Sequence, residues 1–176
     1  MSIENYSIKE KMAFLSNIPD TDYPFISIYM NINAREFLDQ LEKNRILLKN
    51  FFNETEASLK SENNREKLQS FYNDRKKIEN YLNGKINTNA HGLAIFACSK
   101  LGLFEAFLSL MPFDNSFAVD SYPHIRQLAF QTDEYENTLV VMIDSKYARI
   151  FSMKLGGFVI DEYFLESSIH RFHKQG

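Results

Sequence analysis

The residues whose types best suit chemistry lie near the end of the sequence, in the basic run 169–176 (Ile-His-Arg-Phe-His-Lys-Gln-Gly). His170 and His173 are three residues apart and could share a metal ion. No cysteine or carboxylate lies beside them at the spacing of a zinc site, so we predict no metal here. A solvated basic loop is the simpler interpretation, and Arg171 and Lys174 give it the positive charge that contacts phosphates.

Carboxylates form two further candidate sites. Asp133, Glu134 and Glu136 make an acidic cluster, which could perform acid–base chemistry or bind a hard cation. A solvated joint between two parts of the chain is the simpler interpretation of this cluster. Asp144 follows a strongly apolar strand, and there we favour a turn-forming aspartate that makes local backbone hydrogen bonds. We therefore predict no catalytic residue among these carboxylates.

A possible anion site lies at the start of a predicted helix, where Pro123, His124, Ile125 and Arg126 follow one another. The free backbone N–H groups of a helix N-terminus attract anions, and His124 and Arg126 could join them. The structural alternative is that Pro123 only starts the helix and Ile125 packs inward. The residue types favour this alternative, and the anion site stays a hypothesis.

Composition limits the classes of protein to which the chain can belong. Apolar residues make up 44% of the 176 residues, with 16 Phe and 9 Tyr, which is enough for a sizeable core. The net charge is −3 and no segment is strongly basic, so composition alone does not indicate nucleic-acid binding. No apolar run approaches the roughly 20 residues of a membrane span. We expect no membrane partner and no cofactor.

The single cysteine, Cys98, ends an apolar strand and is best interpreted as a small buried hydrophobic residue. One cysteine excludes an internal disulfide and favours a reducing compartment. We therefore expect a cytoplasmic protein.

The elements that must position these residues follow from hydrophobic periodicity. The predicted helices span 7–17, 34–57, 64–82 and 123–132, and the predicted strands span 24–33, 92–98, 103–110, 117–119, 138–143, 147–153 and 158–164. The two long helices should form an antiparallel hairpin, with Asn63 or Asn64 capping the second and Gly84 ending it. The fold class is α/β (α+β), with a mixed sheet and a long helical hairpin, followed by a β-meander.

The polar segment 133–137 is the expected boundary between two parts of the chain. Residues 1–134 form the predicted N-terminal α/β domain. Residues 135–176 form an incomplete β-meander, because its strands come without the helices that would complete a domain.

Several segments together resemble the bacterial relatives of archaeo-eukaryotic peptide-chain release factors, a superfamily that includes Pelota-like ribosome-rescue factors. These segments are 91–98 (His-Gly-Leu-Ala-Ile-Phe-Ala-Cys), Phe104-Glu105, 123–128 (Pro-His-Ile-Arg-Gln-Leu), and 133–135 leading into 139–144. The resemblance extends from about Pro24 onward and includes the long helix pair. It implies that 137–164 is similar to the opening meander of an RNase H-like middle domain, including Asp144, Ala148, Arg149, Ile150 and Phe151.

In release factors, the third strand of this meander leads to a basic loop that carries Gly-Gly-Gln. The glutamine-bearing loop enters the peptidyl-transferase centre and helps water to attack the peptidyl-tRNA ester. The resemblance implies that 168–176 is the approach to such a loop. The residues that would then contact ribosomal RNA are His170, Arg171, His173, Lys174, Gln175 and Gly176. Gly-Gly-Gln does not occur in the sequence, so we expect a fragment of a longer protein, without hydrolytic activity of its own.

The resemblance predicts a translation-associated, ribosome-binding factor that acts in termination, rescue or hibernation. Two alternatives remain. The chain could be an interaction module or oligomerising scaffold that uses its helical hairpin or the edge of its incomplete sheet. It could also be a metal-dependent RNase H-like nuclease that uses Asp144 with the acidic cluster Asp133, Glu134 and Glu136.

Overall fold

Helices and strands follow one another in the order that hydrophobic periodicity predicts, and the α+β class is confirmed. The computed structural model describes residues 8–32, 37–84, 90–134, 138–144, 147–154 and 158–166. The described helices are α1 (Ile8–Ser16), α2 (Phe37–Ser61), α3 (Arg65–Asn83) and α4 (Arg126–Glu134), with a 3₁₀ turn, η3, at Ser99–Leu101. The described strands are β1 (Phe25–Asn31), β2 (Gly92–Cys98), β3 (Leu103–Ser109), β4 (Ser116–Asp120), β5 (Thr138–Ile143), β6 (Tyr147–Lys154) and β7 (Phe158–Glu166). None of these helices is long and apolar enough to cross a membrane.

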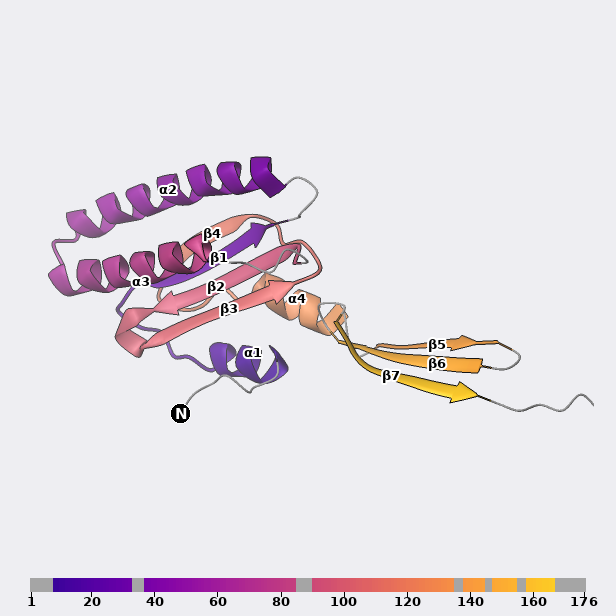
Figure 1. Ribbon diagram of the computed structural model, residues 1–176. Coiled ribbons are helices and arrows are strands. Elements are labelled where there is room, and N and C mark those ends of the chain that lie inside the picture. The colour runs from indigo at the N-terminus through magenta and orange to yellow at the C-terminus, as the bar shows by residue number, and fades with distance from the viewer. Residues whose placement is uncertain are drawn as a thin grey trace, which may run out of the picture.

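Strands β1 to β4 form a four-stranded sheet in the order β3-β2-β1-β4. All of its pairings are antiparallel, whereas the sequence favoured a mixed sheet. The helical hairpin explains the difference. Because α2 and α3 run in opposite directions, the chain re-enters the sheet at the end where it left it, and β2 must run against β1 (Figure 1).

Helices cover both faces of this sheet (Figure 1). The core between the sheet and the pair α2 and α3 includes Ile26, Ile28, Phe52, Phe71, Leu93 and Ile95. The core on the opposite face, beneath α1 and α4, includes Leu15, Phe25, Tyr29, Phe96, Phe107 and Leu128. Central strands that are buried on both faces need apolar side chains at nearly every position, which explains the continuous apolar runs of β1 and β2.

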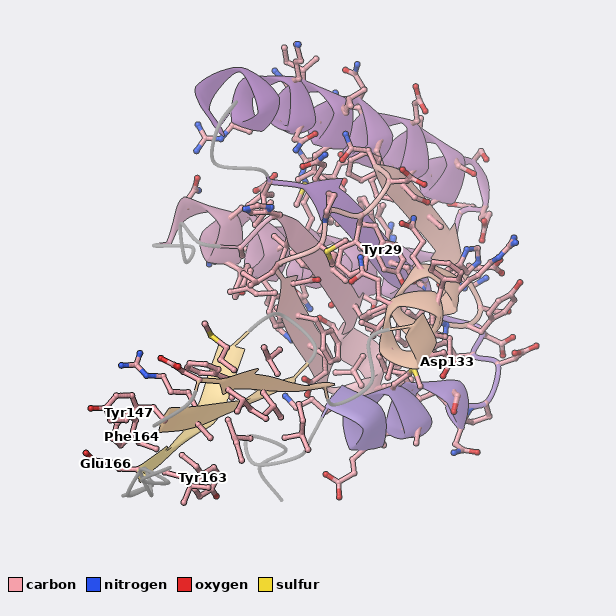
Figure 2. The ribbon with its side chains drawn as sticks, turned by 90° about the vertical axis from the view of Figure 1, so that its right-hand side faces the viewer. Tyr29, Asp133, Tyr147, Tyr163, Phe164 and Glu166 are labelled. Atoms are coloured by element: carbon pink, nitrogen blue, oxygen red, sulfur yellow. The ribbon has the colours of Figure 1, made fainter. Side chains whose placement is uncertain are left out.

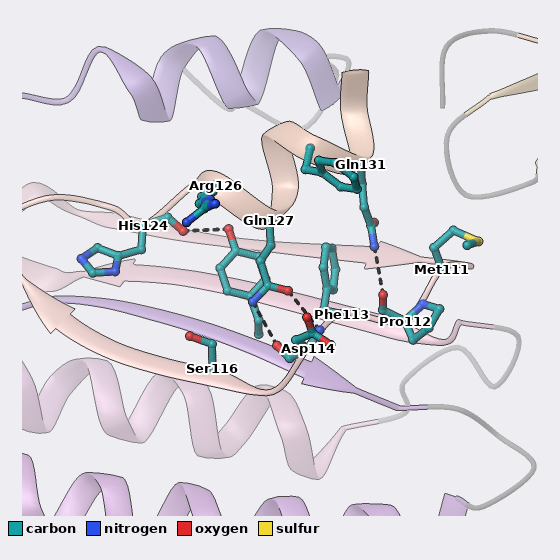
Figure 3. A pocket seen from close by; sticks show the side chains of 11 residues that line it. Met111, Pro112, Phe113, Asp114, Ser116, His124, Arg126, Gln127 and Gln131 are labelled. Atoms are coloured by element: carbon teal, nitrogen blue, oxygen red, sulfur yellow. Dashed lines mark hydrogen bonds between the residues drawn. The ribbon is translucent and has the colours of Figure 1, made fainter. Parts of the chain in front are cut away.

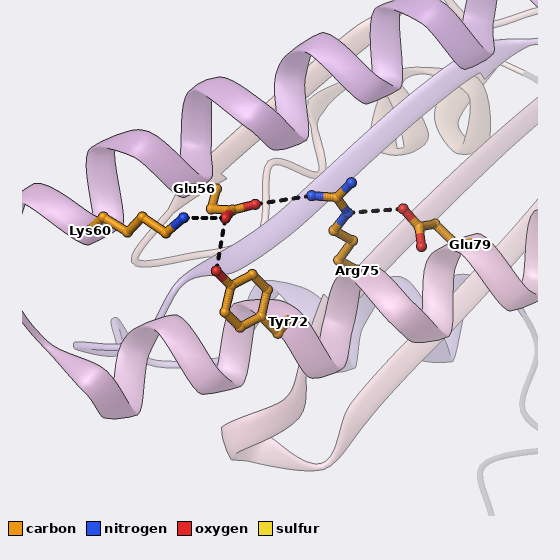
Figure 4. Close-up of polar contacts among 5 residues, drawn as sticks. All are labelled: Glu56, Lys60, Tyr72, Arg75 and Glu79. Carbon is orange, nitrogen blue, oxygen red and sulfur yellow. Dashed lines mark hydrogen bonds and ion pairs between the residues drawn. The ribbon is translucent and has the colours of Figure 1, made fainter.

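A polar network joins α2 to α3 at the edge of their shared core (Figure 4). Glu56 of α2 accepts hydrogen bonds from Lys60 Nζ (2.6 Å), the Tyr72 hydroxyl (2.8 Å) and Arg75 Nη1 (3.2 Å). The bonds from Lys60 and Tyr72, with the positive charges nearby, lower the pKa of the Glu56 carboxyl. Arg75 also donates to Glu79 of its own helix at 2.9 Å. The network therefore links the two helices through a carboxylate that stays ionised at neutral pH.

Strands β5 to β7 form a second, three-stranded antiparallel sheet. Because side chains alternate along a strand, the register places Leu139, Val141, Ile143, Ile150, Tyr163 and Leu165 on one face, which we call the apolar face. The other face, the mixed face, carries Val140, Met142, Tyr147, Arg149, Phe164 and Glu166. Figure 2 shows Tyr147 beside Phe164, with Tyr163 directed away from them. Most of the large apolar side chains described there are 38–79% exposed, with Val140 and Ile143 at the two limits, whereas Ile150 and Phe151 are half-buried. Both faces are therefore largely uncovered in the described residues.

Candidate functional site

A groove of about 670 Å³ lies between α4 and the connection from β3 to β4 (Figure 3). The buried rings of Tyr29 and Phe113 lie beneath it, edge to face, with their centroids 5.1 Å apart. Helix α4 supplies one wall, with Arg126, Gln127 and Phe130 among its lining residues. The groove therefore combines an apolar floor with polar and aromatic side chains at its sides, as ligand sites commonly do.

Two glutamines of α4 fix the opposite wall. Gln127 Nε2 donates to the Asp114 carbonyl at 3.0 Å, and its Oε1 accepts from the Asp114 N–H at 3.0 Å. One helical turn later, Gln131 Nε2 donates to the Pro112 carbonyl at 3.1 Å, and its Oε1 accepts from Ser109 Oγ at 2.9 Å. Side chains four residues apart lie on the same helix face, so both amides reach the same connecting segment. The width of the groove is therefore set by α4.

Helix α4 begins at Arg126, whereas the sequence predicted that it begins at Pro123. The residues between them are tied to β1 instead. The N–H of His124 donates to Ser27 Oγ at 3.0 Å, and the His124 carbonyl accepts from the Tyr29 hydroxyl at 2.7 Å. Burial raises the pKa of Tyr29, so this hydroxyl stays protonated and donates throughout the neutral range. These bonds place the first turn of α4, and with it Arg126, at the rim of the groove.

His124 and Arg126, the residues of the hypothetical anion site, both line the groove but differ in their partners. Nε2 of His124 lies 3.0 Å from Oδ2 of Asp120, and its ring stacks on Tyr122 with the centroids 5.1 Å apart. The hydrogen bond with His124 lowers the pKa of the Asp120 carboxyl. Arg126 is exposed and makes no ion pair within the described part of the chain. The anion site at His124 and Arg126 stays a prediction, with Arg126 as the cation available to an incoming ligand.

The polar side chains around this groove mostly have structural partners. Tyr29, Gln127 and Gln131 are committed to backbone groups, and His124 is committed to Asp120. Within the described ranges, no three Cys, His, Asp or Glu side chains are grouped closely enough to hold a metal ion. The groove is therefore suited to bind a ligand through the exposed guanidinium of Arg126 and through the apolar rings of its floor.

The remaining predicted site residues lie in other places. Asp133 is exposed at the end of α4 (Figure 2), and the backbone N–H of Asp144 donates to the Tyr147 carbonyl at 2.7 Å, which suits a turn residue. The side chain of Glu134, all of Glu136, and the basic residues His170, Arg171, His173, Lys174, Gln175 and Gly176 lie outside the described residues. Cys98 is fully buried, and burial raises the pKa of its thiol, in agreement with a core role.

Sequence reasoning missed Gln127 and Gln131, which build the groove wall. Their signal was a spacing of four residues on one face of a short predicted helix. That spacing shows that the two amides act together, but it does not identify the backbone segment they hold.

Comparison with known proteins identifies no family for this chain. No family model matches it, and no curated protein matches it. A solved structure described as "Archaeal protein" is similar over 87% of this chain, with a TM-score of 0.49 and 16% sequence identity. The chain spans 45% of the length of that structure. A likeness at this level carries no argument about function.

Proposed function

We propose that the chain is a translation-associated, cytoplasmic, ribosome-binding factor of the release-factor-like class. The observation that carries this proposal is the meander β5–β6–β7, which follows the α/β domain as a separate sheet. Asp144 directly follows β5, and Ala148 and Arg149 lie in β6, which is the order that the resemblance implies. A sheet buries its apolar face against another layer of structure, so the exposed apolar face of this meander suits the opening of a larger middle domain that begins near residue 135.

The mixed face of the meander offers groups that suit ribosomal RNA. The guanidinium of Arg149 lies 5.8 Å from the centroid of the Phe164 ring, and Phe164 stacks on Tyr147 with the centroids 5.5 Å apart. Both rings are about half exposed. Arginine contacts phosphates and aromatic rings stack on unpaired bases, so this cluster could contact a single-stranded segment of RNA.

Sedimentation of the purified chain through a sucrose cushion with bacterial ribosomes tests the proposal. We expect the wild type to pellet with ribosomes, and we expect Arg149→Glu and Arg126→Glu to reduce the pelleted fraction. Lys43→Glu is the matched control, because Lys43 is an exposed cation on α2, far in sequence from both arginines. If no variant of the chain pelleted above the level of a ribosome-free sample, the proposal would be wrong.

A second function, self-association as a scaffold, is favoured by the apolar face. Leu139, Val141, Ile143, Tyr163 and Leu165 are 50–79% exposed there, and contiguous apolar patches commonly mark interaction sites. Light scattering over a concentration series is the test.

Self-association predicts an oligomer for the wild type and a monomer for Val141→Asp. Met142→Asp, one residue away on the mixed face, should leave the oligomer intact. A wild type that is monomeric at every concentration would exclude this function.

A further inference from the structure

A second hollow surface lies between the solvent side of α3 and the turn η3. Two shallow hollows of about 400 and 390 Å³ share Asn73 and Ser99 in their linings and therefore adjoin each other. We call these adjoining hollows the α3 groove, and the exposed polar side chains that line them are Glu66, Gln69, Asn73, Lys76, Lys77, Asn80 and Lys100.

A buried carboxylate fixes the two sides of the α3 groove to each other. Asp74 of α3 has no exposed surface, and its two carboxylate oxygens accept from the N–H of Ser99 at 2.9 Å and from Ser99 Oγ at 2.6 Å. Ser99 is the first residue of η3, and Lys100 follows it. The groove is therefore held in shape by a buried, doubly hydrogen-bonded contact.

The charge of the α3 groove is opposite in sign to that of the whole chain. Its lining includes three lysines, Lys76, Lys77 and Lys100, and one carboxylate, Glu66, in a chain of net charge −3. Nζ of Lys100 lies 3.7 Å from Glu66. Lys76 and Lys77 are exposed and make no ion pair among the described residues. Lys76 and Lys77 therefore give the amide-rich side of α3 a positive charge, and the charge of Lys77 also acts on the buried Asp74 carboxylate.

The α3 groove lacks the apolar anchors that protein partners use. Its aromatic side chain, Tyr23, is covered by Lys100, whose Nζ lies 4.4 Å from the ring centroid. The Tyr23 hydroxyl donates to Glu66 at 2.6 Å. Lysines together with Asn and Gln amides are the groups that contact the phosphates and sugars of nucleic acids.

We propose that the α3 groove binds the phosphate–sugar backbone of RNA, with Lys76 and Lys77 on the phosphates and Asn73 and Asn80 on adjacent backbone oxygens. The choice of RNA rests on the proposed ribosomal function, whereas the choice of a phosphate backbone rests on the groove itself. Recognition of this kind is independent of sequence and depends strongly on salt.

Fluorescence anisotropy with a labelled RNA hairpin and the full chain tests the proposal, over KCl concentrations between about 50 and 200 mM. We expect the double variant Lys76→Gln/Lys77→Gln to bind about tenfold more weakly at the lowest salt. The slope of log K against log salt should fall by roughly 2, about one for each lysine. The control Lys43→Gln/Lys49→Gln removes the same charge from exposed positions of α2. It should change neither the affinity for the hairpin nor the slope of log K against log salt by more than about twofold.

Three results would overturn the proposal. Equal losses of RNA affinity in the two double variants would show that binding depends on the net charge of the chain and not on the α3 groove. Tighter binding to a DNA hairpin of the same sequence would exclude RNA as the preferred ligand. Tighter binding to a labelled polyglutamate peptide, lost in Lys76→Gln/Lys77→Gln, would identify an acidic protein as the partner.

Ribosome sedimentation of the same variants separates this proposal from the proposed function. If Lys76→Gln/Lys77→Gln bound the hairpin as tightly as the wild type and both pelleted with ribosomes, the groove proposal would fail while ribosome binding stood. If the hairpin result held and the wild type did not pellet, the groove would stand and the ribosomal function would fail.

Discussion

Replacing Asp74 with asparagine and with alanine separates the cost of a buried charge from the value of its hydrogen bonds. Asp74 has no exposed surface and accepts two bonds from Ser99, which connect α3 to η3. Burial raises the pKa of Asp74 above its ordinary value of 3.8, although the two bonds from Ser99 and the charge of Lys77 oppose this. The burial cost of the carboxylate is therefore only partly offset by its partners.

The two substitutions should differ in magnitude. Hydrogen bonds to a charged group contribute about 1.5–3 kcal/mol each, and alanine removes both while leaving the Ser99 N–H and hydroxyl unpaired. Relief of the buried charge offsets part of this loss, so we expect Asp74→Ala to lower the free energy of unfolding by about 3 kcal/mol at pH 7. Asparagine keeps one acceptor and has no charge to bury, so Asp74→Asn should lose only about 1 kcal/mol.

The pH dependence of the free energy of unfolding tests whether folding raises the pKa of Asp74. An acid whose pKa is raised on folding is protonated in the folded state while it is already ionised in the unfolded state. The stability that Asp74 provides is therefore fully present below the unfolded pKa of 3.8, falls as pH rises through the folded pKa, and is constant above it. The stability of the wild type relative to Asp74→Asn should consequently decrease as pH rises from about 4.

Urea unfolding followed by far-UV circular dichroism suits this measurement, because the chain has no tryptophan to report by fluorescence. If the wild type became more stable relative to Asp74→Asn as pH rose, the reasoning would be refuted. That result would mean that folding lowers the pKa of Asp74 and that its charge is stabilising. Equal losses in the Ala and Asn variants would refute the role given to the Ser99 hydrogen bonds.

Three further predictions concern packing and the helical hairpin. Gly92→Ala should lower the free energy of unfolding by about 2 kcal/mol in urea unfolding, because the new Cβ would overlap the Met111 carbonyl and lie 2.7 Å from the Phe113 ring; an unchanged midpoint would contradict this. Ser70→Ala should raise it by roughly 1 kcal/mol, because Ser70 Oγ is buried with no hydrogen-bond partner among the described residues, and a loss of stability would show that a partner exists. Glu56→Gln should lower the melting temperature in dilute buffer, with a smaller loss near roughly 1 M NaCl, where charges are screened; a loss independent of salt would contradict the ionic account.

The local features of the fold were predictable from sequence because their causes are local. The N-cap of α3 is Asn64, one of the two candidates that the sequence offered, and its side chain accepts from the N–H groups of Glu66 and Lys67 at 3.1 Å each. The helix ends at Asn83, before Gly84. Capping depends on residues within one helical turn, so a single sequence carries the information.

The features that the sequence did not predict depend on contacts between distant segments. Pro123 suits the first turn of a helix, but His124 donates to Ser27 of β1 and accepts from the Tyr29 hydroxyl of the same strand, and the helix begins only at Arg126. These residues are about 95 positions apart in the chain, and periodicity contains no signal for such a contact. Of the residues that line the candidate groove, the sequence indicated His124 and Arg126. It did not indicate the wall, because the wall depends on Gln127 reaching across to another connection.

The two candidate interaction surfaces differ in the force that would drive binding, and salt distinguishes them. Among the described residues, neither core of the first sheet contains a residue after Leu128, so the described part of the meander adds nothing to those cores, and its apolar face is largely exposed. Burial of that face would be strengthened or unchanged as salt rises. Binding at Lys76 and Lys77 would weaken with each increase in salt, because the counterions it releases return to the phosphates. A complex that dissociates with rising KCl therefore depends on cations, namely the lysines of α3 or Arg149 on the mixed face, whereas an assembly that persists depends on the apolar face of the meander.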